Sequence, residues 1–207
     1  MEKLIFSLTM LRSRKALIQK HGKEFWSSFK KSSKEKLKAI LPLTPKIGKS
    51  IFSSNYKFGP AYIAWYKTFI EMGLKQQQAW ENIWLMNEKV VRIMPKFLLN
   101  FLGKAYINSF RKKAPKHIKR QMQNKLHLYD WHITYREISD NTFELDITEC
   151  GLKKLAHAFD ADGLLPGICR MDYMLSNLMG NGFERTKTLG DGDDCCNCGY
   201  HIKGSCD

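Results

Sequence analysis

A chain of 207 residues with 43% hydrophobic residues and five tryptophans can bury a core of its own, which excludes disorder along its whole length. Its net charge of +14 is uneven, since residues 1–130 hold 27 Lys and Arg against 7 Asp and Glu, whereas residues 131–207 hold 7 against 13. Either the basic part meets an anionic surface, or the two parts attract each other, or the basic face is simply solvated. We expect one domain, residues 1–207, with a basic helical part followed by an α+β part that carries the cysteines.

No hydrophobic run approaches the roughly 20 residues that span a bilayer. The chain begins with a short apolar run, but arginines follow it and a small-residue cleavage site does not, so we do not interpret it as a signal peptide. These features predict a cytoplasmic protein. In that compartment thiols stay reduced, which disfavours a disulfide framework among the six cysteines.

The basic part has the spacing of helices. Apolar residues in "FWSSFKKSSKEKLKAIL" recur at helical intervals, and "LPLTPKIGKS" predicts a loop because it holds two prolines and a glycine. Residues 60–94 predict two helices that break at Gly73. Their aromatic stripe is expected in the core rather than at a cofactor, and consists of Tyr62, Trp65, Tyr66 and Phe69.

The segment that follows, residues 94–125, is a basic amphipathic helix by its pattern. Phe97, Phe101 and Phe110 lie among lysines and arginines. Such a helix can dock on the protein's own core, which we favour, or lie on a membrane surface. Weak membrane-surface association is therefore left open as a partner property, and the oligomeric state is not indicated by the sequence.

After Asp130 the pattern changes to that of an α+β fold. "WHITYREI" and "TFELDITEC" alternate apolar and polar residues around "SDN", which predicts a β-hairpin. "GLKKLAHAF" and "PGICRMDYMLSNLMG" predict two helices, with Pro166 in the first turn of the second. "FERTKTL" and "CNCGYHIK" predict a closing pair of strands. The expected order is ββ-α-α-ββ, a small antiparallel sheet on which the basic helices pack.

Two cysteines lie where strands or loops pass into helices. Cys150 ends a predicted strand, and Cys169 is in the first turn of a predicted helix, where free N–H groups and the helix dipole favour a thiolate. Asp172 follows three residues later on the same face and could move protons or orient a cation. Taken singly, each cysteine is more often a buried structural thiol than a reactive one.

The segment "RTKTLGDGDDCCNC" supplies other polar groups. Arg185 could hold a carboxylate in a bidentate manner, and Thr186 or Thr188 could offer a hydroxyl. Gly190 and Gly192 permit positive φ, so backbone N–H groups of this turn could approach a ligand. An ordinary hairpin turn explains the same glycines and aspartates.

A metal site is a further alternative. Cys195, Cys198, His201 and Cys206 give the pattern C-x2-C-x2-H-x4-C, loosely that of a zinc knuckle. The gap before His201 is short for a knuckle, and the segment alternates like a strand. These cysteines also lie in the acidic part of the chain, so no nucleic-acid partner is expected. We predict no cofactor, with zinc or iron as the alternative.

In order and spacing, "FELDITEC", "CRMD" and "FERTKTLGDGDDCCN" resemble the L-2-amino-thiazoline-4-carboxylic acid hydrolase family over residues 143–198. In that family a strand ends in cysteine, C-x-x-D follows, and the end reads R-T-x-T-(L/I)-x-x-G-x-x-x-C-D. The matching positions are Cys150, Cys169, Asp172, Arg185, Thr186, Thr188, Gly192 and Cys196. The family's final aspartate is Asn197 in this chain, which removes a charge and puts the family's substrate and activity in question.

The resemblance implies hydrolysis of a small thiazoline or cyclic amidine, as in the opening of L-2-amino-thiazoline-4-carboxylate to N-carbamoyl-L-cysteine. We hypothesise that Cys169 is the nucleophile, Asp172 the acid/base or the anchor for the substrate amidine, and Arg185 the clamp for the substrate carboxylate. Cys150 and Cys196 are expected to line the same site, with Thr186, Thr188, Gly192 and Asn197 binding substrate. Cys195, Cys198 and Cys206 are interpreted as incidental. The competing hypothesis is a non-enzymatic module whose cysteines bind a metal or sense redox state.

Overall fold

The computed structural model describes residues 2–204, and its basic part is helical. The helices are α1 (Glu2–His21), α2 (Lys23–Leu43), α3 (Ser53–Glu71), α4 (Gln76–Val91) and α5 (Lys96–Met122). Gly73, with a φ of +85°, lies between α3 and α4, so the predicted break is confirmed. The predicted loop after α2 starts later than expected, because α2 continues through Pro42 to Leu43.

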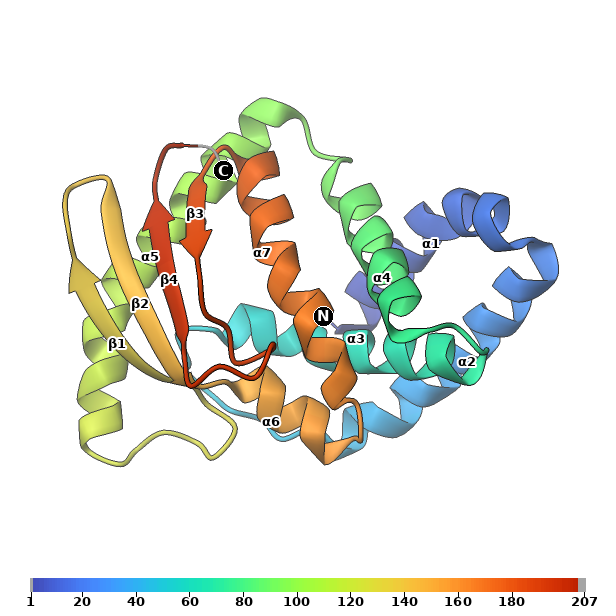
Figure 1. Cartoon of the computed structure of the whole chain (residues 1–207), viewed down its shortest axis with the longest axis horizontal. Helices are drawn as coiled ribbons and strands as arrows, with labels where there is room; N and C mark the ends of the chain where they lie inside the picture. Colours follow the sequence, from blue (N-terminus) through green and yellow to red (C-terminus); the bar gives the residue numbers. More distant parts are fainter. Residues whose placement is uncertain (1, 205–207) are drawn as a thin grey trace.

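The remaining residues form the predicted α+β unit, and the α+β fold class is confirmed. Its elements are β1 (His132–Glu137), β2 (Thr142–Glu149), α6 (Gly151–Ala158), the 3-10 turn η1 (Asp162–Leu164), α7 (Leu165–Met179), β3 (Gly182–Arg185) and β4 (Cys196–His201). The sheet order is β1-β2-β4-β3 with antiparallel neighbours throughout. In Figure 1 the sheet stands at one end of the molecule, and α7 runs beside β3.

Helix α3 lies at the centre of the helical half, and the neighbouring helices cover most of its surface. The predicted aromatic stripe lies in the core: Tyr62, Trp65, Tyr66 and Phe69 are all buried. Trp65 stacks on Phe6 of α1 with ring centroids 5.3 Å apart, and Phe69 stacks on Phe29 of α2 at 4.2 Å. Burial of these rings is the main attraction between α3 and its neighbours.

Helix α5 packs against the inner face of the sheet, which Figure 1 shows as a long helix behind the strands. The ring centroid of Phe110 lies 5.6 Å from that of Tyr200 on β4, and Tyr200 stacks on Phe143 of β2 at 5.1 Å. The expectation that α5 docks on the protein's own core is therefore confirmed. Its other side remains exposed at Phe97 and Phe101.

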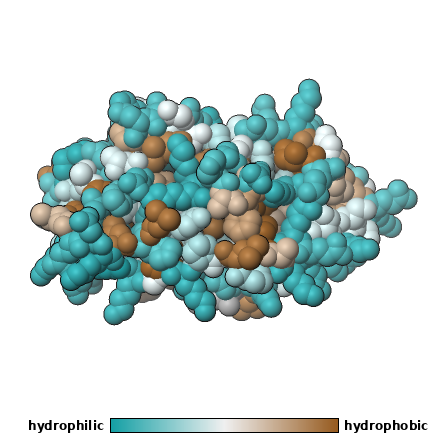
Figure 2. Space-filling model, turned by 90° about the horizontal axis from the view of Figure 1, so that it is seen from below, coloured by the Kyte–Doolittle hydropathy of each residue, from teal (hydrophilic) through white to brown (hydrophobic). Residues whose placement is uncertain are grey.

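Strand register decides which side chains face the helices. Cys198 on β4 stands opposite Leu145 on β2 and Arg185 on β3, and these positions share the inner face. Asn197 stands opposite Asp146 on the outer face. Seen from below, the molecular surface is mostly hydrophilic, with hydrophobic groups scattered between polar ones (Figure 2). Among residues 2–204, none of the helices combines the length and apolar character needed to cross a membrane.

Candidate active site

An aspartate on α7 and an arginine at the end of β3 form an ion pair on the inner side of the sheet. Arg185 Nη1 donates to Asp172 Oδ2 at 2.9 Å, and Arg185 Nη2 donates to the carbonyl oxygen of Cys169 at 2.7 Å. The guanidinium carbon lies over the rings of Phe183 and Tyr173, at 5.2 and 5.6 Å from their centroids. The Arg185 side chain is only 5% exposed, whereas that of Asp172 is 40% exposed. Solvent therefore reaches the Asp172 side chain, although much protein surrounds it, and hardly reaches the guanidinium.

The pair alters the protonation of both groups. Burial raises the pKa of Asp172 above its ordinary value, although the charge and hydrogen bond of Arg185 oppose the shift. Burial alone would lower the pKa of Arg185, but Asp172, Cys198 and Cys169 together raise it, so the guanidinium stays charged. Asp172 is thus a carboxyl group that takes up a proton more readily than an exposed aspartate, which suits an acid/base role.

Three thiols gather between α6, α7 and β4. Cys196, at the start of β4, accepts a hydrogen bond from the Leu189 N–H at 3.3 Å, and its Sγ is 3.5 Å from Thr188 Oγ1. Thr188 also hydrogen-bonds the thiol of Cys169 on α7. Cys150, just before α6, interacts electrostatically with both Cys196 and Cys169. The three cysteines named from the sequence therefore lie together.

Cys169 and Cys150 are held in their neutral form. Burial raises the pKa of Cys169 to about 12, with further increases from Asp172 and Cys150, and raises that of Cys150 to about 11. Hydrogen bonds from the backbone amides of Lys153 and Leu152 lower the pKa of Cys150, but by less than burial raises it. The expectation of an acidic Cys169 thiolate is wrong, because Cys169 is the fifth residue of α7 and its desolvation outweighs the helix dipole.

These shifts predict a loss of stability at alkaline pH. A folded-state pKa above the unfolded one means that the folded protein retains a proton which the unfolded chain releases. The stabilisation is complete below about pH 9 and declines as the pH rises toward 11–12. The free energy of unfolding should fall by roughly 1.4 kcal/mol per pH unit for each thiol in this window. Urea unfolding at pH 8 to 11 under reducing conditions measures the slope.

Cys169→Ala provides the comparison for that slope. Removing one titrating thiol should reduce the number of protons released on unfolding by about one. Identical slopes for the wild type and Cys169→Ala would contradict the raised pKa of Cys169.

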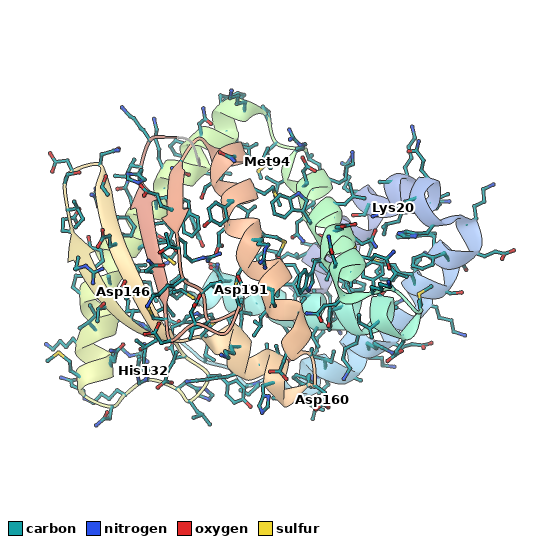
Figure 3. The ribbon with its side chains drawn as sticks, viewed as in Figure 1. Lys20, Met94, His132, Asp146, Asp160 and Asp191 are labelled. Carbon is teal, nitrogen blue, oxygen red and sulfur yellow. The ribbon has the colours of Figure 1, made fainter. Side chains whose placement is uncertain are left out.

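The connection between β3 and β4, residues 186–195, covers Cys169. Gly190 lies so close that a Cβ there would be 2.8 Å from Cys169 Sγ. The loop is held by the side chain of Asp193, which accepts the Thr188 N–H at 2.7 Å, and by Arg170 of α7, whose Nη1 is 3.1 Å from Asp191 Oδ1. Asp191 is visible between the sheet and α7 in Figure 3. Gly192, with a φ of +98°, sits in open space farther along this turn.

Two of the sequence-predicted residues lie elsewhere. Thr186 and Asn197 line a depression of about 310 Å³ on the outer face of the sheet, whose wall also includes Asp146 and atoms of Arg185 and Cys198. Asn197 Oδ1 accepts the N–H groups of Thr186 and Lys187 at 3.1 and 2.6 Å, and its Nδ2 donates to Thr186 Oγ1 at 2.7 Å. Asn197 thus fastens the loop to β4 and does not lie among the thiols.

The contacts of Asn197 predict how its substitutions behave. An aspartate could accept the same two N–H groups and the Thr186 hydroxyl hydrogen, so Asn197→Asp should change the free energy of unfolding by less than about 1 kcal/mol. Asn197→Ala removes the one oxygen that accepts both N–H groups and should cost about 1–2 kcal/mol. Denaturant unfolding of the two variants measures the difference. Equal losses in both variants would show that the two N–H bonds do not matter.

Sequence reasoning missed two residues beside the thiols. Cys198, interpreted as incidental, lies on the inner face near Arg185, and burial raises its pKa well above the ordinary range. Strand alternation was a sufficient signal, since Cys196 and Cys198 must share a face. Lys153, three residues after Cys150, is half-buried and donates from Nζ to the carbonyl oxygen of Leu189 at 3.2 Å. The sequence feature that could have identified Lys153 is its position in the first turn of the helix that follows Cys150.

The zinc-knuckle pattern is not assembled by the described residues. Within residues 2–204, no three His, Cys, Asp or Glu side chains gather in a group that could hold a metal ion. Cys198 faces inward, whereas His201 hydrogen-bonds to Thr142 and Glu184 on the outer side of β4. Cys206 lies outside the described residues.

Comparison with known proteins identifies one family. The sequence profile described as L-2-amino-thiazoline-4-carboxylic acid hydrolase matches residues 54–200, well over half of the chain and considerably more than the resemblance in residues 143–198. A search of curated proteins finds no match. The matched range includes the Asp172–Arg185 pair, the three clustered thiols and the loop that covers Cys169. The chain therefore belongs to the L-2-amino-thiazoline-4-carboxylic acid hydrolase family.

Proposed function

We propose that the protein is a hydrolase that opens a small cyclic amidine or thiazoline, with L-2-amino-thiazoline-4-carboxylate as the reference substrate. Family membership supports a hydrolase-type function. In the proposed reaction water adds its oxygen to ring carbon C2 and the bond between C2 and the ring sulfur breaks. One proton of water ends on the released thiol and the other on the former ring nitrogen, giving N-carbamoyl-L-cysteine.

The single observation that carries the proposal is the accessible carboxyl group of Asp172 beside a neutral thiol. Asp172 is held by Arg185 and acts electrostatically on Cys169. In the first step Asp172 takes the thiol proton of Cys169 while the sulfur attacks C2, and it then returns this proton to the departing ring sulfur. In the second step Asp172 takes one proton from a water whose oxygen attacks C2 and gives it to the departing sulfur of Cys169, and the other water proton ends on the former ring nitrogen.

Arg185 has a different part in this proposal from the one that the resemblance suggested. One of its terminal nitrogens is bonded to Asp172 and the other to the Cys169 carbonyl, and its side chain is nearly inaccessible. We assign to it the positioning of Asp172 relative to Cys169. Lys153 is the cation we assign to the substrate carboxylate, because it is half-buried beside the Cys150–Cys196 thiols and has a neutral carbonyl oxygen as its hydrogen-bond partner.

Turnover of the reference substrate tests the function directly. Purified protein incubated with L-2-amino-thiazoline-4-carboxylate should release one free thiol per molecule of N-carbamoyl-cysteine formed, measured by a thiol reagent and by mass spectrometry. Lys153→Gln should raise KM for the carboxylate substrate more than it lowers kcat. Absence of product from this thiazoline and from its descarboxy analogue would overturn the proposal.

A further inference from the structure

Helix α5 presents two exposed aromatic rings at its N-terminal end. Phe97 is 76% exposed and Phe101, one helical turn later, is 67% exposed. Neighbouring Ile93 and Leu102 are 42% and 37% exposed, so the rings are part of a wider apolar patch. Met94, at the top of Figure 3, marks this end of the molecule. The patch is held outward because the opposite face of α5 is buried, at Leu99, Gly103, Ile107 and Phe110.

The same exposed side of α5 is basic beyond the rings. Of the five exposed lysines that follow the apolar patch along α5, four lie on or beside this side of the helix: Lys104, Lys112, Lys116 and Lys119. Counted from Phe97 at 3.6 residues per turn, Lys104 and Lys119 fall on the side of the two rings, and Lys112 and Lys116 lie next to it. An apolar patch and a row of positive charges therefore lie on the same exposed side of α5.

We propose that this face of α5, defined by Phe97, Phe101 and the four lysines, binds the surface of an anionic membrane. The rings would enter the boundary between headgroups and acyl chains while the lysines approach the lipid phosphates. Ile93 and Leu102 favour acyl chains over nucleic-acid bases, because aliphatic side chains offer no stacking surface to a base. A second copy of this face is disfavoured, since its lysines would approach lysines of the same charge.

The membrane face is separate from the proposed catalytic groups. Residues of α5 that point toward the sheet, such as Phe110, lie between the two regions. Binding to lipid therefore does not depend on the proposed hydrolase reaction, and neither result decides the other.

Vesicle co-sedimentation tests the proposal with the full chain. Vesicles of phosphatidylcholine with 30% phosphatidylserine should pellet the protein at low salt, and pure phosphatidylcholine vesicles should pellet far less. Phe97→Ser with Phe101→Ser should weaken binding at least about tenfold. Lys104, Lys112 and Lys116 changed to Gln should weaken it about a hundredfold, since each lysine near the surface contributes roughly fivefold.

Matched variants separate these effects from general hydrophobicity and charge. Leu43→Ser with Leu128→Ser removes two side chains that are 70% and 75% exposed outside α5, and should leave lipid binding unchanged. Lys30, Lys34 and Lys38 changed to Gln removes the same charge from the exposed side of α2 and should weaken binding less than about threefold. Circular dichroism confirms that each variant folds.

Four outcomes would overturn the proposal. The first is equal sedimentation with charged and neutral vesicles, and the second is equal losses from the α5 and α2 lysine variants. The third is a Phe97- and Phe101-dependent dimer by light scattering with no lipid binding, which would assign the face to a second copy. Binding of a single-stranded RNA oligonucleotide that is tighter than vesicle binding and lost in the phenylalanine variant would assign it to nucleic acid.

Discussion

Cys169→Ala should lower kcat for thiazoline opening by at least roughly 10³-fold, because it removes the group that forms the proposed bond to C2. The variant should remain folded, since the substitution removes a single sulfur atom from a partly buried position. Mass spectrometry of rapidly quenched wild-type protein should show an adduct on the peptide that contains Cys169, and the variant should show none.

Cys198→Ala is the matched control for that experiment. Cys198 is a buried thiol with a strongly raised pKa beside Arg185, but the proposed mechanism gives it no bond to substrate. It should retain turnover within about tenfold of the wild type. Full turnover by Cys169→Ala would remove the thiol from the mechanism and leave direct attack by water with Asp172 as the base.

Asp172→Asn should lower kcat by roughly 10²–10⁴-fold, the range that an acid/base group contributes. Asparagine keeps the size of the side chain and an oxygen for Arg185, so the loss would report proton transfer rather than misfolding. In the wild type kcat/KM should fall as the pH decreases through the pKa of Asp172. That pKa is raised by burial, so the decline should begin at a higher pH than for an ordinary aspartate.

The pH profile of the variant is the control for Asp172. The kcat/KM of Asp172→Asn should show no decline as the pH decreases, and should keep the same small value across that pH range. An unchanged acid limb in the variant would assign the titration to another group. Thermal unfolding should accompany these measurements, because Arg185 is nearly inaccessible and loses its charged partner in this variant.

Local patterns in the sequence were sufficient for the fold of residues 131–204. Alternation along β2 places Phe143, Leu145 and Ile147 on the buried face, and pairing with β4 then fixes the face of Cys196 and Cys198. The break at Gly73 likewise depends on one residue in a left-handed conformation. These features are local or follow from strand register, so the sequence predicts them.

The candidate site was less predictable because its properties depend on packing between distant elements. The helix-terminus argument for Cys169 considered only its own helix, whereas the loop 186–195 and the neighbouring thiols determine its desolvation. Arg185 was expected to meet a substrate, but its place on the inner face directs it to Asp172, thirteen residues earlier in the chain. No pattern within either segment indicates that contact.

The approach of Gly190 to Cys169 has a kinetic consequence. A Cβ at position 190 would lie 2.8 Å from Cys169 Sγ, so a glycine at this position leaves the space beside the sulfur unfilled. Any larger residue would crowd the thiol or push residues 186–195 away from it, against the Arg170–Asp191 pair that fastens them to α7. Gly190→Ala should therefore slow formation of the proposed adduct more than it changes the protonation of Asp172, because the carbon that bonds to the sulfur must approach through the space that the new methyl group would fill.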